Sequence, residues 1–78
     1  MNSLYQYGSC EIVLEDYLKK NNISKNSLAK KAELQRTQLN AYCKNKVKCP
    51  SADVLARICW ALNCEVGDIV HYIKPTRV

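Results

Sequence analysis

Two short amphipathic segments separated by only three residues constrain the fold of this chain more than any other feature. Each segment has an apolar face, formed by Leu28, Ala29 and Ala32 in the first and by Leu39 and Tyr42 in the second. The joint, residues 33–35, is too short for the segments to lie antiparallel as in a hairpin of long helices. The pattern therefore predicts two helices that cross steeply, and the second helix then projects from the surface.

Polar side chains occupy the outward face of the second helix, where they could enter the major groove of DNA. Arg36 at its start suits guanine, because a guanidinium can donate to both O6 and N7; a phosphate contact remains open for it. Thr37 could meet a base edge or a thymine methyl group. Asn40 could pair with adenine or contact only a phosphate, and Ala41 could offer only a small apolar contact.

The segment ISKNSLAKKAELQRTQLNAY, residues 23–42, resembles the helix-turn-helix of the Xre/Cro family, repressors of phages and bacterial operons. The segment PSADVLARICWALNCEVGDIV, residues 50–70, is similar to the fourth and fifth helices of that family. The resemblance implies an all-α fold: a compact five-helix bundle containing a helix-turn-helix, as in lambda-repressor-like domains. It also implies that the residues matching Arg36, Thr37 and Ala41 lie against base edges.

One position departs from the family pattern. Glu33 stands in the joint where the family often has glycine. A left-handed conformation there would cost a glutamate on the order of 1 kcal/mol.

Basic residues concentrate around the two crossing helices. Residues 19–48 hold nine basic side chains and one acid, Glu33, although the whole chain has a net charge of only +5. A patch this one-sided attracts a polyanion such as a DNA backbone. Seven flanking side chains are therefore candidate phosphate contacts: Lys25, Gln35, Gln38, Lys44, Asn45, Lys46 and Lys48. The family places a backbone clamp at the position of Lys25, at a helix start that favours an anion.

The patterning divides the chain into an N-terminal arm (1–13), a helix-turn-helix domain (14–72) and a tail (73–78). We expect helices over 14–21, 25–32, 36–44, 52–62 and 66–71, with Ser24 and Ser51 as N-caps and Asn63 as a left-handed stop. The expected core positions in the last two helices are Leu55, Ile58, Cys59, Leu62 and Ile69, with Val70 or Tyr72. Residues 10–13 could extend a short strand, or the arm could be a frayed tail; both remain open.

Five cysteines raise the question of a disulfide or metal site. An odd count, no Cys-x-x-Cys pair and a single histidine argue against both, so we expect no metal and no cofactor. Cys43 and Cys49 bracket the loop after the second crossing helix, and a redox role there is a minor alternative to inert thiols.

Trp60 lies beside the apolar face of its helix, and an exposed tryptophan needs a cover. We expect Trp60 to join Tyr72 and Ile73, or Leu4, Tyr5 and Tyr7, in a two-fold dimer contact. Packing under the N-terminal arm is the alternative. A homodimer suits the expected function, because one helix reads only a few base pairs.

The sequence thus predicts a transcriptional regulator, a repressor that binds a palindromic operator in double-stranded DNA. No signal peptide or bilayer-spanning run is visible, so we expect a cytoplasmic protein that does not insert into a membrane. A chain of 78 residues leaves no room for a small-molecule effector domain, and no acid/base constellation suggests an enzyme. The alternative function is a protein-interaction module on the same scaffold, such as an antitoxin or antirepressor partner.

Overall fold

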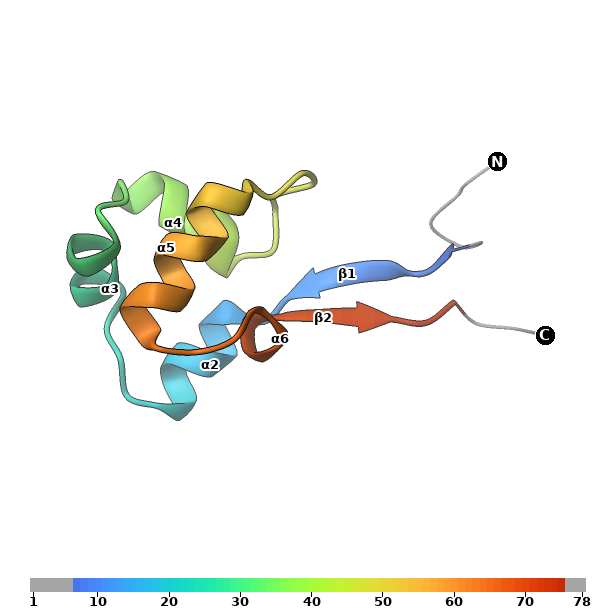
Figure 1. Ribbon diagram of the computed structural model, residues 1–78, viewed down its shortest axis with the longest axis horizontal. Helices are drawn as coiled ribbons and strands as arrows, with labels where there is room; N and C mark the ends of the chain where they lie inside the picture. The colour runs from blue at the N-terminus through green and yellow to red at the C-terminus, as the bar shows by residue number, and fades with distance from the viewer. Residues whose placement is uncertain (1–6, 76–78) are drawn as a thin grey trace.

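A computed structural model describes residues 7–75, in which five helices form a body and two strands form an arm (Figure 1). The elements in chain order are β1 (Ser9–Ile12), α2 (Leu14–Lys20), α3 (Lys25–Ala32), α4 (Arg36–Cys43), α5 (Ala52–Leu62), α6 (Val66–Ile69) and β2 (Val70–Ile73). The two crossing helices of the sequence prediction are α3 and α4.

The helix starts agree with the predicted caps. The Ser24 hydroxyl accepts a hydrogen bond from the Ser27 N–H at 3.1 Å, and the Ser51 hydroxyl accepts from the Val54 N–H at 3.4 Å. Each bond satisfies one of the N–H groups that a helix start leaves without a partner. These short serine signals therefore set the beginnings of α3 and α5.

Four helices of the body end at a left-handed residue that is not glycine. These residues are Asn22, Glu33, Asn45 and Asn63, each with φ between 55° and 58°. After each of them the chain closes a hydrogen bond back over the last turn, as the Leu34 N–H does to the Ala29 carbonyl at 2.9 Å. Asparagine tolerates this conformation well, whereas Glu33 adopts it with the strain expected from the sequence.

The core lies where the helices meet. Each of the five helices contributes one of its largest fully buried side chains: Leu14, Leu28, Leu39, Ile58 and Ile69. The predicted inner face of α5 needs a correction. Ile58 is fully buried as predicted, but the other buried residues are Val54 and Ala61, whereas Leu55, Cys59 and Leu62 are half-buried and pack against the core. The buried stripe of α5 is spaced by four and three residues, so the centre of its buried face is rotated from the predicted one.

The fold is mostly helical but not all-α, because the chain contains a two-stranded antiparallel sheet. The last helix ends at Ile69 rather than His71, and residues 70–73 continue as β2, paired with β1. Val70, Tyr72 and Ile73 are β-branched or aromatic and suit a strand once a partner strand is available. Of the two residues expected to follow Ile69 into the core, Val70 is half-buried against it, whereas Tyr72 is 59% exposed.

The sheet projects from the helical body. Figure 1 shows β1 and β2 running side by side away from the helices, and the molecule measures 44 × 21 × 17 Å. Gly8, with φ of +83°, comes so close to β2 that a Cβ there would collide with the Ile73 carbonyl oxygen. In the part of the chain that the structure describes, no helix has the length and apolar character needed to cross a membrane.

Candidate nucleic-acid interface

A hydrogen bond joins the starts of α3 and α4, between residues that are ten apart in the sequence. The Arg36 guanidinium, at the first position of α4, donates a hydrogen bond to the Asn26 side-chain oxygen at the start of α3. The bond limits the freedom of a long side chain that is otherwise exposed. The crossing of the two helices therefore presents Arg36 already oriented, at an edge where two helix N-termini add positive potential.

The outward face of α4 carries the residues predicted to meet base edges. Arg36 and Thr37 are exposed, and Asn40 and Ala41 are half-buried one turn further along. The opposite face is buried as predicted at Leu39 and Tyr42, and Cys43 is buried beside them. The four candidates thus share one accessible stripe on a firmly packed helix.

A hydrogen bond from the neighbouring helix fixes the inner face of α4. The Tyr42 hydroxyl accepts from the Ser51 N–H at 2.9 Å, at the residue that caps α5. Because Tyr42 spans from α4 to the start of α5, the outer stripe cannot rotate without breaking this contact. A rigid element is what a reading surface needs.

Lys25 forms an ion pair within the chain. Its ammonium lies 3.4 Å from a carboxylate oxygen of Glu15 on α2, and Lys19 approaches the other oxygen of that carboxylate at 3.5 Å. The charge of Lys25, followed by hydrogen bonds from Lys25 and Lys19, lowers the pKa of Glu15 from 4.5. Glu15 neutralises part of the basic cluster of residues 19–48, which we call the cationic side. It also holds the Lys25 side chain against α2.

The residues around α4 that were predicted to contact phosphates differ in exposure and in whether they already bond within the chain. Gln35 and Gln38 are exposed, and so are Lys44, Lys46 and Lys48 in and after the last turn. Asn45 is engaged: its side-chain oxygen accepts a hydrogen bond from the Ile12 N–H at 2.9 Å. This bond ties the loop after α4 to the base of the arm, a role that the sequence did not suggest.

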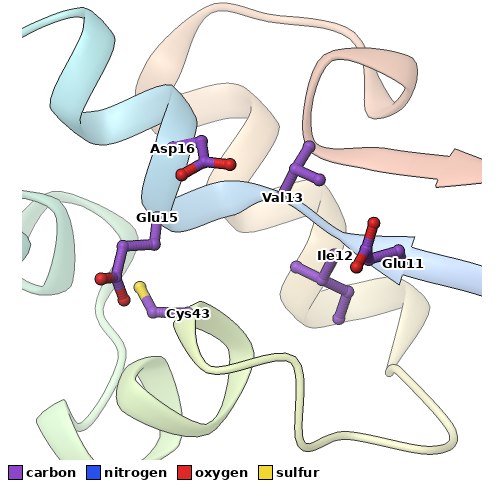
Figure 2. Close-up of a pocket in the computed structure, with 6 residues that line it drawn as sticks. All are labelled: Glu11, Ile12, Val13, Glu15, Asp16 and Cys43. Carbon is purple, nitrogen blue, oxygen red and sulfur yellow. The ribbon is translucent and has the colours of Figure 1, made fainter.

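A hollow of about 260 Å³ lies at the base of the arm, between β1, α2 and α4. Figure 2 shows its lining: Glu11, Ile12, Val13, Glu15, Asp16 and Cys43. Burial raises the pKa of the Cys43 thiol, which disfavours a reactive thiolate. Within residues 7–75 no group of three or more His, Cys, Asp or Glu side chains could hold a metal ion.

The three residues predicted for a dimer contact do not lie together. Trp60, on α5, is 70% exposed and sits beside α3, with the Lys31 ammonium 5.9 Å from its ring centre. Tyr72 and Ile73 are on β2 in the projecting arm, with Tyr7 nearby. Leu4 and Tyr5, named as alternative partners for Trp60, lie outside the described residues.

Sequence reasoning missed two residues that shape the cationic side, Asn26 and Glu15. A signal for Asn26 existed, since the steep crossing brings the second position of α3 near the first position of α4. Glu15 is ten residues away from Lys25 in the sequence, and their contact depends on the packing of α2 against the later helices.

A comparison with protein-family models matches residues 13–75 to the model described as a Cro/C1-type HTH DNA-binding domain. A search of curated proteins finds no match to the chain. The family match begins directly after β1 and continues through β2, so it includes both crossing helices and the second strand of the arm but not β1.

Proposed function

Since this chain belongs to the Cro/C1-type helix-turn-helix DNA-binding family over residues 13–75, we propose that it is a sequence-specific transcriptional regulator. It places α4 in the major groove of double-stranded DNA, and as a homodimer it represses at a palindromic operator. The observation that carries this proposal is the exposed stripe of α4, bordered by lysines and led by an Arg36 that Asn26 already holds.

Each part of the cationic side has a distinct role in this proposal. Arg36 pairs with a guanine, and Thr37, Asn40 and Ala41 complete the base contacts. Phosphates are contacted by the flanking set: Lys25, Gln35, Gln38, Lys44, Asn45, Lys46 and Lys48. Lys25 exchanges Glu15 for a phosphate, and Asn45 has its amide N–H groups left to donate while its oxygen holds the Ile12 N–H. The regulator acts without catalysis and without a cofactor.

Base contacts and phosphate contacts give different signatures in a binding titration. The bound sequence is first selected from random oligonucleotides, and the selected and random duplexes are then titrated by fluorescence anisotropy at several salt concentrations. Arg36→Ala should cost about 1–3 kcal/mol on the selected duplex and less on the random one. Lys46→Ala is the matched control: it should weaken both duplexes equally and make the salt slope shallower.

The salt slope provides a second check. If about six phosphates are neutralised, the slope of log K against log salt should be roughly −5. An equal loss on both duplexes for Arg36→Ala would show that Arg36 does not read bases. Binding that does not depend on salt would remove the DNA-binding role altogether.

Exposed Trp60 favours the second candidate function, a protein-interaction module. The ring borders a hollow of about 210 Å³ with Lys31, Ala32, Glu33 and Arg57. A chain that showed no salt-sensitive DNA binding, yet bound a protein through Trp60, would fit this alternative.

A further inference from the structure

The arm has one apolar face that begins in the core and then runs out of it. Residues directly opposite each other in an antiparallel pair share a face. Ile12 pairs with Val70 and Cys10 pairs with Tyr72, so these four side chains lie on the same side of the sheet. Ile12 is 6% exposed and Val70 is half-buried, whereas Cys10 and Tyr72, one step further from the body, are exposed.

The end of the arm is apolar on its other side as well. Ile73, opposite Ser9, lies on the second face and is 45% exposed. Tyr7 is also exposed, and its carbonyl accepts a hydrogen bond from the Tyr72 hydroxyl at 2.6 Å. Apolar side chains therefore gather at the part of the molecule that is farthest from its own core.

A two-stranded sheet with two open edges is marginal in water by itself. Such a sheet becomes stable when further strands or another surface cover it, and its free edges offer unpaired backbone groups for that purpose. In the described chain the helices cover only the inner half of the arm, at Ile12 and Val70 (Figure 1). Among residues 7–75 no helix covers the outer half, which leaves it open to a partner from another molecule.

The charge of the arm selects a protein partner over DNA. Residues 7–12 and 70–75 contain one acid, Glu11, and one lysine, Lys74, while residues 19–48 contain nine basic side chains and one acid. A nearly neutral apolar arm gains little from a phosphate backbone. For the same reason two copies of the arm can approach each other without the repulsion that would oppose contact between two cationic sides.

We propose that the outer half of the arm, built around Cys10, Tyr72 and Ile73, is the surface through which a second copy of this chain binds. The inference deepens the homodimer of the proposed function and rests on it for its purpose, since it leaves α4 of each copy free to face DNA. The contact joins arm to arm across a two-fold axis, which makes the same residues meet on both sides. Trp60 lies outside it.

The expected dimer is modest in strength. A standard stable interface buries roughly 800 Å² on each partner, and two strands of four residues each offer a smaller surface. Self-association should therefore depend on concentration. A duplex carrying two half-sites should strengthen it, because the two bound copies are held at a high effective concentration.

Two matched pairs of substitutions test the surface by analytical ultracentrifugation of the full chain. Ile73→Lys changes an aliphatic residue on the arm, and Val66→Lys changes one of similar exposure on α6, 49% against 45%. Tyr72→Lys and Trp60→Lys form the aromatic pair. Wild type, Val66→Lys and Trp60→Lys should dimerise alike, and the two arm variants should raise the dissociation constant at least ~10-fold.

A cross-linking experiment reports on the contact without disturbing it. In a Cys49→Ser background, a short bismaleimide should join two chains through Cys10, which is exposed in the single chain. Cys10→Ser added to that background should abolish the product. Far-UV circular dichroism and thermal melts identify any variant that fails to fold, and the cross-link then replaces that variant as the test.

The outcomes separate this inference from the proposed function. A wild-type chain that stays monomeric at every concentration overturns the arm contact, and so does a dimer that survives both arm substitutions or is lost only with Trp60→Lys. Binding of wild type and of each variant to a duplex that carries one half-site is measured in parallel. If Ile73→Lys is monomeric yet binds a half-site like wild type, the arm contact is supported. If the arm dimer forms but no duplex is bound, only the proposed function fails.

Discussion

The helical body and the β arm solve the problem of stability in different ways. In the body, five fully buried side chains come together from five helices, and serine or left-handed residues close the helix ends. In the arm, only Ile12 is buried, and the remaining residues are half-buried or exposed. The body has a buried core of its own, whereas the arm depends on its attachment to the body and on whatever covers its outer half.

Charge follows the same division. The cationic side belongs to α3, α4 and the loop after them, and the arm is nearly neutral. One region is suited to a polyanion and the other to an apolar protein surface. In the function and the dimer that we propose, recognition of DNA and association of copies therefore occupy separate parts of a very small domain.

The largest expected effect tests whether the body alone carries global stability. Ile58→Ala removes a fully buried side chain and should lower the free energy of unfolding by about 2–5 kcal/mol. Tyr72→Ala, in the exposed arm, should lower it by less than about 1 kcal/mol. Urea unfolding followed by far-UV circular dichroism measures both. Equal losses would mean that arm and body unfold as one unit.

The next effect is confined to the arm. Gly8→Ala places a Cβ against the Ile73 carbonyl in a left-handed conformation, so it should cost the local pairing about 1–2 kcal/mol. Amide hydrogen exchange in β1 and β2 should accelerate while that of α4 and α5 stays unchanged. Ser9→Ala serves as the control, because Ser9 is the next residue and its φ is not positive.

A smaller effect concerns how Arg36 is held. Asn26→Ala removes the acceptor of the Arg36 hydrogen bond and should weaken binding to the selected duplex by about 0.5–1.5 kcal/mol. The loss should be smaller than that of Arg36→Ala and should vanish when Arg36 is already alanine. A double-mutant cycle by fluorescence anisotropy measures the coupling, and additive losses would contradict a positioning role.

The smallest effect is electrostatic and depends on pH. The pKa of Glu15 is lowered in the folded chain, chiefly by the charge of Lys25, so its ion pairs stabilise the fold above pH 4.5 and are lost as pH falls through the folded-state pKa. Glu15→Gln should therefore be slightly less stable than wild type at neutral pH and equally stable in more acidic solution. Thermal melts across that range measure the difference.

Two further measurements sharpen the Glu15 comparison. Glu15→Gln should bind random duplex more tightly than wild type, because it releases Lys25 and removes an acid beside the cationic side. Asp16→Asn is the control, since Asp16 forms no ion pair among the described residues. Both differences should shrink at high salt.

Local signals in the sequence were sufficient for most of the helical body. Ser24, Ser51 and Asn63 mark the limits of helices through bonds within a few residues, and the apolar spacing of residues 28–42 predicted the buried faces of α3 and α4. These predictions succeeded because a helix is built from contacts between neighbours in the chain. The clustering of basic residues was equally visible, since it needs only a count along the sequence.

The remaining features depend on contacts between distant residues. Residues 70–73 continue as a strand because β1 lies beside them, and the Tyr7 and Tyr72 contact joins positions 65 residues apart. Asn45 holding the Ile12 N–H, Asn26 holding Arg36, and the separation of Trp60 from the arm have the same origin. The chain by itself determined where its helices begin, where most of them end and where they carry charge. Only the tertiary structure decided which of those ends meet, because contacts between residues distant in the chain form only when the helices and strands pack together.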